Sequence, residues 1–527
     1  MKHFTITFQP DGSRIVIHEG ATLLEAAGQA GIILNTVCGG KSTCGKCRII
    51  LQPSGQEVLG CQYIIRSDLT LTVPQQSRFY EPKILEHGIE IQARFRDKFA
   101  AATLQTAQAF GLAVDIGTTT IVAKLIDLAD GKIIATMSGM NPQIKYGDDV
   151  ISRIFYGQTD EKLAQLHSEI INFVNETTGK ICRQTKISSN QILEMSVVGN
   201  TTMHHLFLRL PVAQLGQAPY KAFSLDARNV PAKELSLKIN PDANVYVAPC
   251  IAGFVGADTT AVALAVDIAS AKQMTLAVDI GTNGEIVLGT SEQLYSASCA
   301  AGPAFEGARI TFGSRAADGA IEAVVINKDD IDIDVIGNTS PRTICGSAII
   351  DTVAVLLNLG IIDTTGRFLG HDELQAKLPP KLFSRITEYN GQPAFCLAFA
   401  ENSKTPAVFL TQNDIRQTQL AKAAIRTGIK LLQKKIGIAD SDIQLVLLAG
   451  AFGNYIRREN ALRIGLLPDV PLERIHFVGN AACSGAEMML LSRTWRIEAE
   501  KLAAKIKYVE IAHEKDFTEV YAESMLF

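Results

Sequence analysis

Short runs of alternating apolar and polar residues mark the first 75 positions of the chain. FTITF at residues 4 to 8 and RIVIH at residues 14 to 18 alternate with a period of two, and Asp11-Gly12 stands between them. That pattern predicts a β-hairpin closed by a tight turn. ATLLEAAGQAGI then places apolar residues at helical spacing, and the strand-like runs CRIILQ and LTLTV follow it. We therefore expect a hairpin, a short helix and further strands.

Two longer hydrophobic runs share a second pattern. LAVDIGTTTIVAKLID begins at residue 112 and LAVDIGTNGEIVLGT at residue 276, and each continues from an apolar run through Asp-Ile-Gly-Thr into a β-rich run. Each is interpreted as a hairpin whose tight turn carries an exposed Asp and Gly. A third run, LVLLAGAFGNYI at residues 445 to 456, predicts a strand that ends in glycines before a helix. One such turn would be weak evidence for a binding site, because any hairpin can contain it. Two turns in matching contexts predict a pair that face each other across a cleft.

The residue types in these turns suit a nucleotide. Glycine lets backbone amides approach phosphate oxygens, threonine hydroxyls donate hydrogen bonds, and aspartate can hold a hydrated Mg²⁺. We therefore expect Asp115 and Asp279 to position Mg²⁺, and Glu285 to orient Mg²⁺ or water. The residues expected to bind the nucleotide itself are, for the phosphates, Gly117, Thr118, Thr119, Thr120, Gly281, Thr282, Asn283 and Gly284 and, for adenosine, Gly450, Phe452 and Gly453.

Composition and charge narrow the class of protein. A chain of 527 residues is too long for one ordinary domain. Its 50 Lys+Arg and 54 Asp+Glu give a formal net charge of −4 without a basic run, which argues against a nucleic-acid partner held by phosphate contacts. No apolar segment approaches the ~18 residues of a membrane helix, and the N-terminus lacks a signal-peptide core. We expect a soluble, cytoplasmic protein without a membrane partner.

Four of the ten cysteines gather near the N-terminus. CGGKSTCGKC, residues 38 to 47, ends like a Walker loop, but Asn35 occupies the position of the first glycine and argues against that motif. A glycine-rich loop that presents three thiols, followed by a fourth, suits an iron–sulfur cluster. Zinc is the main alternative, although structural zinc usually pairs two C-x2-C knuckles and only one is present. The predicted metal ligands are Cys38, Cys44, Cys47 and Cys61.

The first 75 residues and the three later hydrophobic runs each resemble a known fold. Over about residues 1 to 75 the order of elements resembles the β-grasp [2Fe-2S] ferredoxins, although Cys61 lies closer to Cys47 than the fourth ligand does in plant-type members. The three later runs resemble the phosphate-1, phosphate-2 and adenosine motifs of the superfamily of acetate and sugar kinases, heat-shock chaperones and actin. The implied fold class is α+β and α/β: a β-grasp ferredoxin-like domain followed by a two-lobed, ribonuclease-H-like (actin-like) ATPase that closes over ATP.

Five further stretches narrow the resemblance. They are NPQIKYGDDVISRI (141 to 154), VVGNTTMHHLFL (197 to 208), CAAGPAFEGARI (299 to 310), CGSAIID (345 to 351) and VGNAACSGA (478 to 486). With the two domains, they resemble the ATP-dependent reductive activators of corrinoid proteins. The resemblance implies a [2Fe-2S] cluster, ATP and Mg²⁺ as cofactors, and one-electron reduction of Co(II) to Co(I) in a corrinoid protein of a methyltransferase system. It also implies a low-potential electron donor, and it leaves room for a homodimer.

The same resemblance implies a division of the chain. Residues 1–75 would form the [2Fe-2S] domain and 76–111 a linker, and 112–272 and 273–527 would form the two ATPase subdomains. Some relatives carry an extra small domain before the ATPase, for which residues 76 to 111 are too few. Another activator type carries C-terminal [4Fe-4S] clusters, whereas the C-terminal KYVEIAHEKDFTEVYAESMLF has no cysteine.

Two other classes of protein use the same kind of cleft. A small-molecule kinase would release a phosphorylated product, and a non-redox chaperone would bind ATP and a client without a reducible cluster. Other conspicuous residues are expected to be structural. His204-His205 are adjacent and cannot share a helical face, and Cys299 and Cys345 suit small-residue packing. INKDDIDIDVI, residues 326 to 336, has carboxylates at alternate positions and is interpreted as an ordinary exposed hairpin face.

Overall fold

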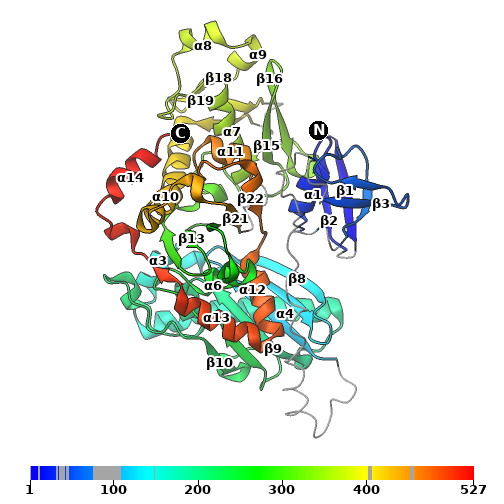
Figure 1. Cartoon of the computed structure of the whole chain (residues 1–527), viewed down its shortest axis with the longest axis vertical. Helices are drawn as coiled ribbons and strands as arrows, with labels where there is room; N and C mark the ends of the chain where they lie inside the picture. The colour runs from blue at the N-terminus through cyan, green and yellow to red at the C-terminus, as the bar shows by residue number, and fades with distance from the viewer. Residues whose placement is uncertain are drawn as a thin grey trace.

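The computed structural model shows an N-terminal part and two larger lobes, each built on its own main sheet (Figure 1). The structure describes residues 2–9, 12–30, 32, 34, 42, 47–74, 77, 108–147, 149–400, 406–450 and 456–527. Most of the predicted linker, residues 76 to 111, therefore lies outside the described residues. Within the described part of the chain, no helix is long and apolar enough to cross a membrane.

The N-terminal sheet has the strand order β2-β1-β5-β3-β4, in which β1 and β5 are parallel. β1 and β2 form the predicted hairpin, and Ile6 and Phe8 of the alternating run are buried. Thr22 caps α1, because the Glu25 NH donates to the Thr22 hydroxyl (3.2 Å) and the Thr22 NH donates to the Glu25 carboxylate (2.7 Å). The bounds are β1 His3–Gln9, β2 Arg14–His18, α1 Leu23–Gln29, β3 Arg48–Gln52, β4 Glu57–Leu59 and β5 Leu69–Thr72.

The first lobe is a six-stranded sheet in the order β10-β11-β9-β6-β7-β8. β7 pairs antiparallel with both β6 and β8, whereas β9 joins β6 in parallel. The apolar run of β6 is almost wholly buried, as expected for a central strand covered on both faces. The bounds are β6 Phe110–Ile116, β7 Thr120–Asp127, β8 Ile133–Met140, α3 Val150–Tyr156, α4 Asp160–Thr185, β9 Ile192–Gly199, α5 Thr201–Phe207, β10 Arg228–Pro231, β11 Asn244–Val247 and α6 Ala257–Ala265.

The second lobe repeats this arrangement in the order β22-β21-β12-β13-β14-β23. Asp279 on β12 pairs with β13 and β21 as Asp115 on β6 pairs with β7 and β9, so the repeated sequence runs occupy equivalent places in the two sheets. The strands are β12 Thr275–Ile280, β13 Gly284–Gly289, β14 Leu294–Cys299, β15 Ala320–Asn327, β16 Asp330–Val335, β17 Thr343–Ile344, β18 Ile386–Tyr389, β19 Gln392–Ala398, β20 Val408–Thr411, β21 Leu445–Ala449, β22 Ile475–Phe477 and β23 Lys507–Tyr508. The helices are α7 Gly346–Asn358, α8 His371–Lys377, α9 Pro380–Phe383, α10 Gln412–Ile436, α11 Arg458–Arg463, α12 Ala481–Leu491, α13 Arg493–Lys505 and α14 Phe517–Ser524.

Helices α6 and α12 lie where the two lobes meet (Figure 1). Their buried side chains share one apolar cluster with Ala113 of the first sheet and Leu447 of the second. The helices cross very closely, since a Cβ added at Gly485 of α12 would lie 2.3 Å from the carbonyl oxygen of Ala261 in α6. A single packed layer therefore connects the two lobes, and a glycine permits its tightest contact.

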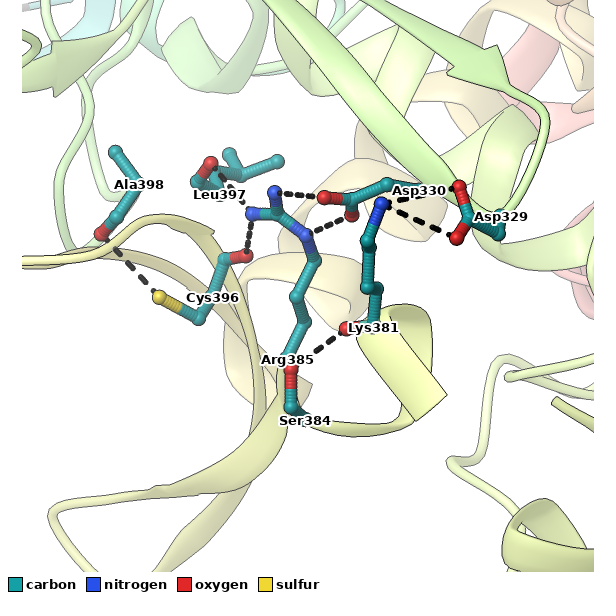
Figure 2. A network of polar contacts seen from close by, with 8 residues as sticks. All are labelled: Asp329, Asp330, Lys381, Ser384, Arg385, Cys396, Leu397 and Ala398. Atoms are coloured by element: carbon teal, nitrogen blue, oxygen red, sulfur yellow. Dashed lines mark hydrogen bonds and ion pairs between the residues drawn. The ribbon is translucent and has the colours of Figure 1, made fainter. Parts of the chain in front are cut away.

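The β15–β16 hairpin projects beside the N-terminal part (Figure 1). Arg385 holds its tip, with Nε 2.5 Å from Asp330 Oδ1, and it also donates to the carbonyls of Cys396 and Leu397 at 3.1 Å (Figure 2). Such a paired, charge-assisted contact fixes geometry. The hairpin itself confirms the sequence interpretation. The interpretation of its carboxylates as exposed is wrong for Asp334, which is 1% exposed because His3 of the N-terminal sheet lies against it.

Gly485→Ala should destabilise the ATPase lobes by about 1–3 kcal/mol, because the new methyl group overlaps the α6 backbone. Gly179→Ala in α4 is the matched control, since a Cβ there meets only the guanidinium of Arg183 at 3.5 Å and should add about 0.4–1 kcal/mol of stability. Urea unfolding followed by circular dichroism measures both. Equal midpoints for the two variants would contradict the close helix crossing.

Candidate functional site

A cavity of about 390 Å³ lies between the lobes and contains both predicted turns. Gly284 does not line it, because Gly284 begins β13 and a Cβ there would meet Ile425 at 2.7 Å. Phe452 and Gly453 lie outside the described residues, so the predicted adenosine segment is located only at Gly450. The predicted residues that do line the cavity are Asp115, Gly117, Thr118, Thr119, Thr120, Asp279, Gly281, Thr282, Asn283, Glu285 and Gly450.

The first turn follows β6 and is closed by its own backbone. The Gly117 NH donates to the Thr120 carbonyl at 2.9 Å, and a Cβ at Gly117 would lie 2.7 Å from that same oxygen. Only glycine fits this turn without a shift of the backbone. The Asn200 amide donates to the Thr118 hydroxyl at 2.8 Å and so orients that side chain.

The second turn faces the first. The Gly281 NH donates to the Asn283 carbonyl at 3.1 Å, which closes the turn. The Thr282 hydroxyl donates to Glu306 at 2.5 Å, so Thr119 of the first turn is the donor in the 3.2 Å contact between the Thr119 and Thr282 hydroxyls. The two turns thus touch across the cleft, and a phosphate group entering between them would replace this hydroxyl pair.

Gly450 packs against one of the carboxylates. It has a φ of +97°, and a Cβ there would lie 2.6 Å from Asp279 Oδ1. Its NH donates to the Gly479 carbonyl at 3.0 Å. Glycine is required on both counts, because the backbone is left-handed and the side-chain space is taken.

Four acidic side chains converge at the base of the cleft: Asp115, Asp258, Asp279 and Glu285. Burial, followed by the charge of Asp258, raises the pKa of Asp115 and that of Asp279 to about 7. Burial also raises the pKa of Asp258 to about 6, and the pKa of Glu285 well above its ordinary value. Negative charges gathered out of water are unfavourable unless a cation or protons balance them. This donor set suits Mg²⁺, which prefers carboxylate oxygens and phosphate.

Sequence reasoning missed Asp258, Asn200 and Asn480. Asn200 and Asn480 are the N-caps of α5 and α12, where each side-chain oxygen accepts a backbone NH. The amide of Asn480 also bonds to Asp115, and Asp258 lies in the first turn of α6. Their signal in the sequence is that of any helix start and does not distinguish them from other helix caps. Here three helix starts point at one cleft and hold its acidic and hydroxyl groups.

The two described thiols of the predicted cluster site lie at one end of a hairpin. Cys47 precedes β3 and Cys61 follows β4, and the Gly60 NH donates to the Cys47 carbonyl at 2.7 Å. Both cysteines are buried in the N-terminal core. Cys38 and Cys44 lie outside the described residues. Two thiols brought together in this way fit a site for an iron–sulfur cluster or zinc.

The residues expected to be structural are buried. His204 and His205 are 2% and 0% exposed, and burial lowers the pKa of His204 to about 3, so it is neutral. Cys299 packs behind Glu285, where burial raises the pKa of its thiol. Cys345 is also buried but lies in the wall of the cavity.

The stabilising effect of Mg²⁺ should increase with pH between about 5.5 and 8. Below their raised pKa values of about 6 to 7 the cleft carboxyls bind protons, which compete with Mg²⁺. Because these values lie above the ordinary 3.8, the metal-free protein loses stability as pH rises through that window, and Mg²⁺ restores it. Thermal unfolding with and without Mg²⁺ across this pH range measures the effect.

Asp258→Asn should move the midpoint of that pH dependence to lower pH, because the charge of Asp258 raises the pKa of Asp115 and of Asp279. The exposed Asp242→Asn serves as control and should leave the midpoint in place. An Mg²⁺ effect that does not change with pH would contradict this account of the cleft.

Proteins similar to this chain match it over nearly its whole length. Residues 110–271 match a family model described as the RACo middle region, and residues 273–527 match one described as the C-terminal domain of RACo, the ASKHA domain. The chain is 35% identical to the corrinoid activation enzyme RamQ of Eubacterium limosum, over 97% of both chains. It is 26% identical to the [Co(II) methylated amine-specific corrinoid protein] reductase of Methanosarcina barkeri, over 75% of this chain and 73% of that one.

A solved structure of a reductive activator for corrinoid,iron-sulfur protein has the same fold. It superposes with a TM-score of 0.75 and 30% sequence identity, and the match covers 99% of this chain and 98% of that one. The predicted fold class, a β-grasp domain followed by a two-lobed actin-like ATPase, is therefore confirmed. The combination of these matches over nearly the whole length shows that the chain belongs to the family of reductive activators of corrinoid proteins.

Proposed function

We propose that this protein uses ATP to drive one-electron reduction of a corrinoid protein of a methyltransferase system, which restores Co(I) from Co(II). The observation that carries the proposal is the presence, in one chain, of two of the predicted ligand cysteines in a β-grasp core and of a two-lobed cleft with two opposed Asp-Ile-Gly-Thr turns. A kinase would need only the second of these. The relatives named for corrinoid activation and corrinoid protein reduction support the same class of substrate.

The electron-carrying part is residues 1–75. Cys38, Cys44, Cys47 and Cys61 would hold a [2Fe-2S] cluster, which supplies one-electron transfer at ~−400 mV in plant-type ferredoxins. The β3–β4 hairpin brings Cys47 and Cys61 together, and the surrounding apolar side chains limit access of water. Each ~59 mV of mismatch in a one-electron transfer costs a factor of ten. Reduction of a cobalt centre of still lower potential is therefore uphill and has to be coupled to ATP.

The cleft would supply that coupling. Asp115 and Asp279 would hold Mg²⁺, Thr119 and Thr282 would exchange their mutual hydrogen bond for bonds to phosphate, and Glu285 would orient water. Tight binding of ATP alone shifts no equilibrium, so the lobes must close into a form that binds the corrinoid protein differently. Helices α6 and α12, packed between the lobes, are the elements that closure would move.

The chain would be divided into a linker, residues 76–111, and two ATPase subdomains, residues 112–272 and 273–527. A separate low-potential donor would reduce the N-terminal domain, and the protein would work in the cytoplasm, as a monomer or a homodimer.

Anaerobic absorbance of a candidate corrinoid protein, mixed with this protein and a reductant, tests the proposal. Conversion of the Co(II) spectrum to that of Co(I) should require ATP. Cys61→Ala should abolish the conversion and bleach the visible absorbance of the cluster, while nucleotide affinity stays within about twofold, because the thiol lies in a separate core.

Cys182→Ala is the matched control, since this half-buried cysteine of α4 lies in the first lobe and should leave all three measurements unchanged. Conversion without ATP, or equal conversion by Cys61→Ala, would contradict the proposal. Zinc in place of iron and labile sulfide in anaerobically purified protein would contradict the cluster assignment.

A further inference from the structure

The N-terminal sheet meets the second lobe at the β15–β16 hairpin (Figure 1). His3 begins β1, Glu322 lies on β15 and Asp334 lies on β16. His3 Nε2 is 2.8 Å from Asp334 Oδ1, and the side chains of these two residues are 7% and 1% exposed. One ligand atom from each of the three residues lies within 4.8 Å of the other two. An imidazole and two carboxylates from two separate domains therefore converge on one small, largely buried space.

A β-bulge places Glu322 in this group. Ile321 pairs with Val335 and Ala323 pairs with Asp334, so Glu322 is the extra residue on its strand. In a regular ladder, Glu322 would point to the face opposite its neighbours Ile321 and Ala323. A bulge changes the direction of the extra side chain, and bulges are frequent beside functional sites. Glu322 stands next to Ala323, which pairs with Asp334, so the bulge lies where the two carboxylates meet.

Apart from His3, the two carboxylates have no basic partner among the residues that the structure describes. Among the described residues, no lysine or arginine forms an ion pair with Glu322 or Asp334. Two carboxylates in a largely buried space repel each other when they are ionised, and a bound cation would balance their charge.

We propose that His3, Glu322 and Asp334 form a binding site for a divalent first-row transition-metal ion, which bridges the N-terminal domain and the ATPase. One imidazole and two carboxylates are a common donor set for such ions. Bonds of ~2.0–2.2 Å hold ligand atoms at most about 4.4 Å apart, so small side-chain rotations from the present separation are sufficient. The site is distinct from the Mg²⁺ site of the proposed function and does not depend on it.

The bridge would reach the wall of the nucleotide cavity. Glu322 also lines that cavity, and its carbonyl accepts a hydrogen bond of 2.7 Å from Ser347 in the first turn of α7. Arg385 fixes the far end of the same hairpin (Figure 2). A metal ion at this site would therefore attach the N-terminal domain to a strand that is anchored at its tip and forms part of the cavity.

Mn²⁺ added to the full-length protein without nucleotide tests the proposal. Pulsed electron paramagnetic resonance detects the ¹⁴N nucleus of an imidazole bound to Mn²⁺. The acidic cleft can bind Mn²⁺ as well, but none of the described residues that line it is a histidine. Wild-type protein should show the ¹⁴N modulation. His3→Gln and Asp334→Asn should each abolish it and weaken binding of this Mn²⁺ at least tenfold.

His371→Gln is the matched control, because His371 is an exposed imidazole 3.8 Å from the carboxylate of Asp372. It should leave the modulation unchanged. Circular dichroism and urea unfolding show that each variant is folded. Absence of the modulation in wild-type protein, or its survival in a folded His3→Gln or Asp334→Asn variant, would overturn the proposal and leave an ordinary ion pair between His3 and Asp334.

Discussion

The concentration of negative charge at the meeting point of the lobes is the constraint on which the structure depends. Asp115 and Asp258 come from the first half of the chain, and Asp279 and Glu285 from the second. Burial, and after it their mutual repulsion, keeps the pKa values of these carboxyls high. In the proposed function, a cation bound there would be attracted to both lobes at once. Neutralising the site would then also draw the lobes together, which a site confined to one lobe could not do.

The elements around the cleft are arranged to transmit that event. Helices α6 and α12 both begin at the cleft, and both pack in the apolar layer shared by the two sheets. Close-packed helices move as rigid bodies, so a shift at their N-terminal ends has to be accommodated along their length. On the other side, the β15–β16 hairpin contributes Glu322 to the cavity wall and Asp334 to the contact with His3. The nucleotide site and the N-terminal domain thus share one hairpin.

Much of the fold could be predicted from local pattern. Alternation with a period of two identified the hairpin of β1 and β2, and the paired Asp-Ile-Gly-Thr runs identified two equivalent strands and their turns. These features depend on neighbours in sequence and on the conformational freedom of glycine, as at Gly117. The order of motifs then pointed to the two-domain family. Local pattern does not predict the surroundings of Gly284. This residue is next to the turn in sequence, but it packs against Ile425, which is distant in sequence.

The sequence by itself determined which side chains share a strand face or a turn, and the order of its motifs resembled a family, which implied the fold class. Only the tertiary structure decided what each of those faces meets. Asp258 and Asn480 have the sequence signature of ordinary helix starts, and they belong to the cleft because long-range packing aims three helix starts at one point. Asp334 stands in a pattern typical of solvent-exposed strands, yet a domain more than 250 positions away in sequence covers it. Local periodicity carries no information about such distant partners.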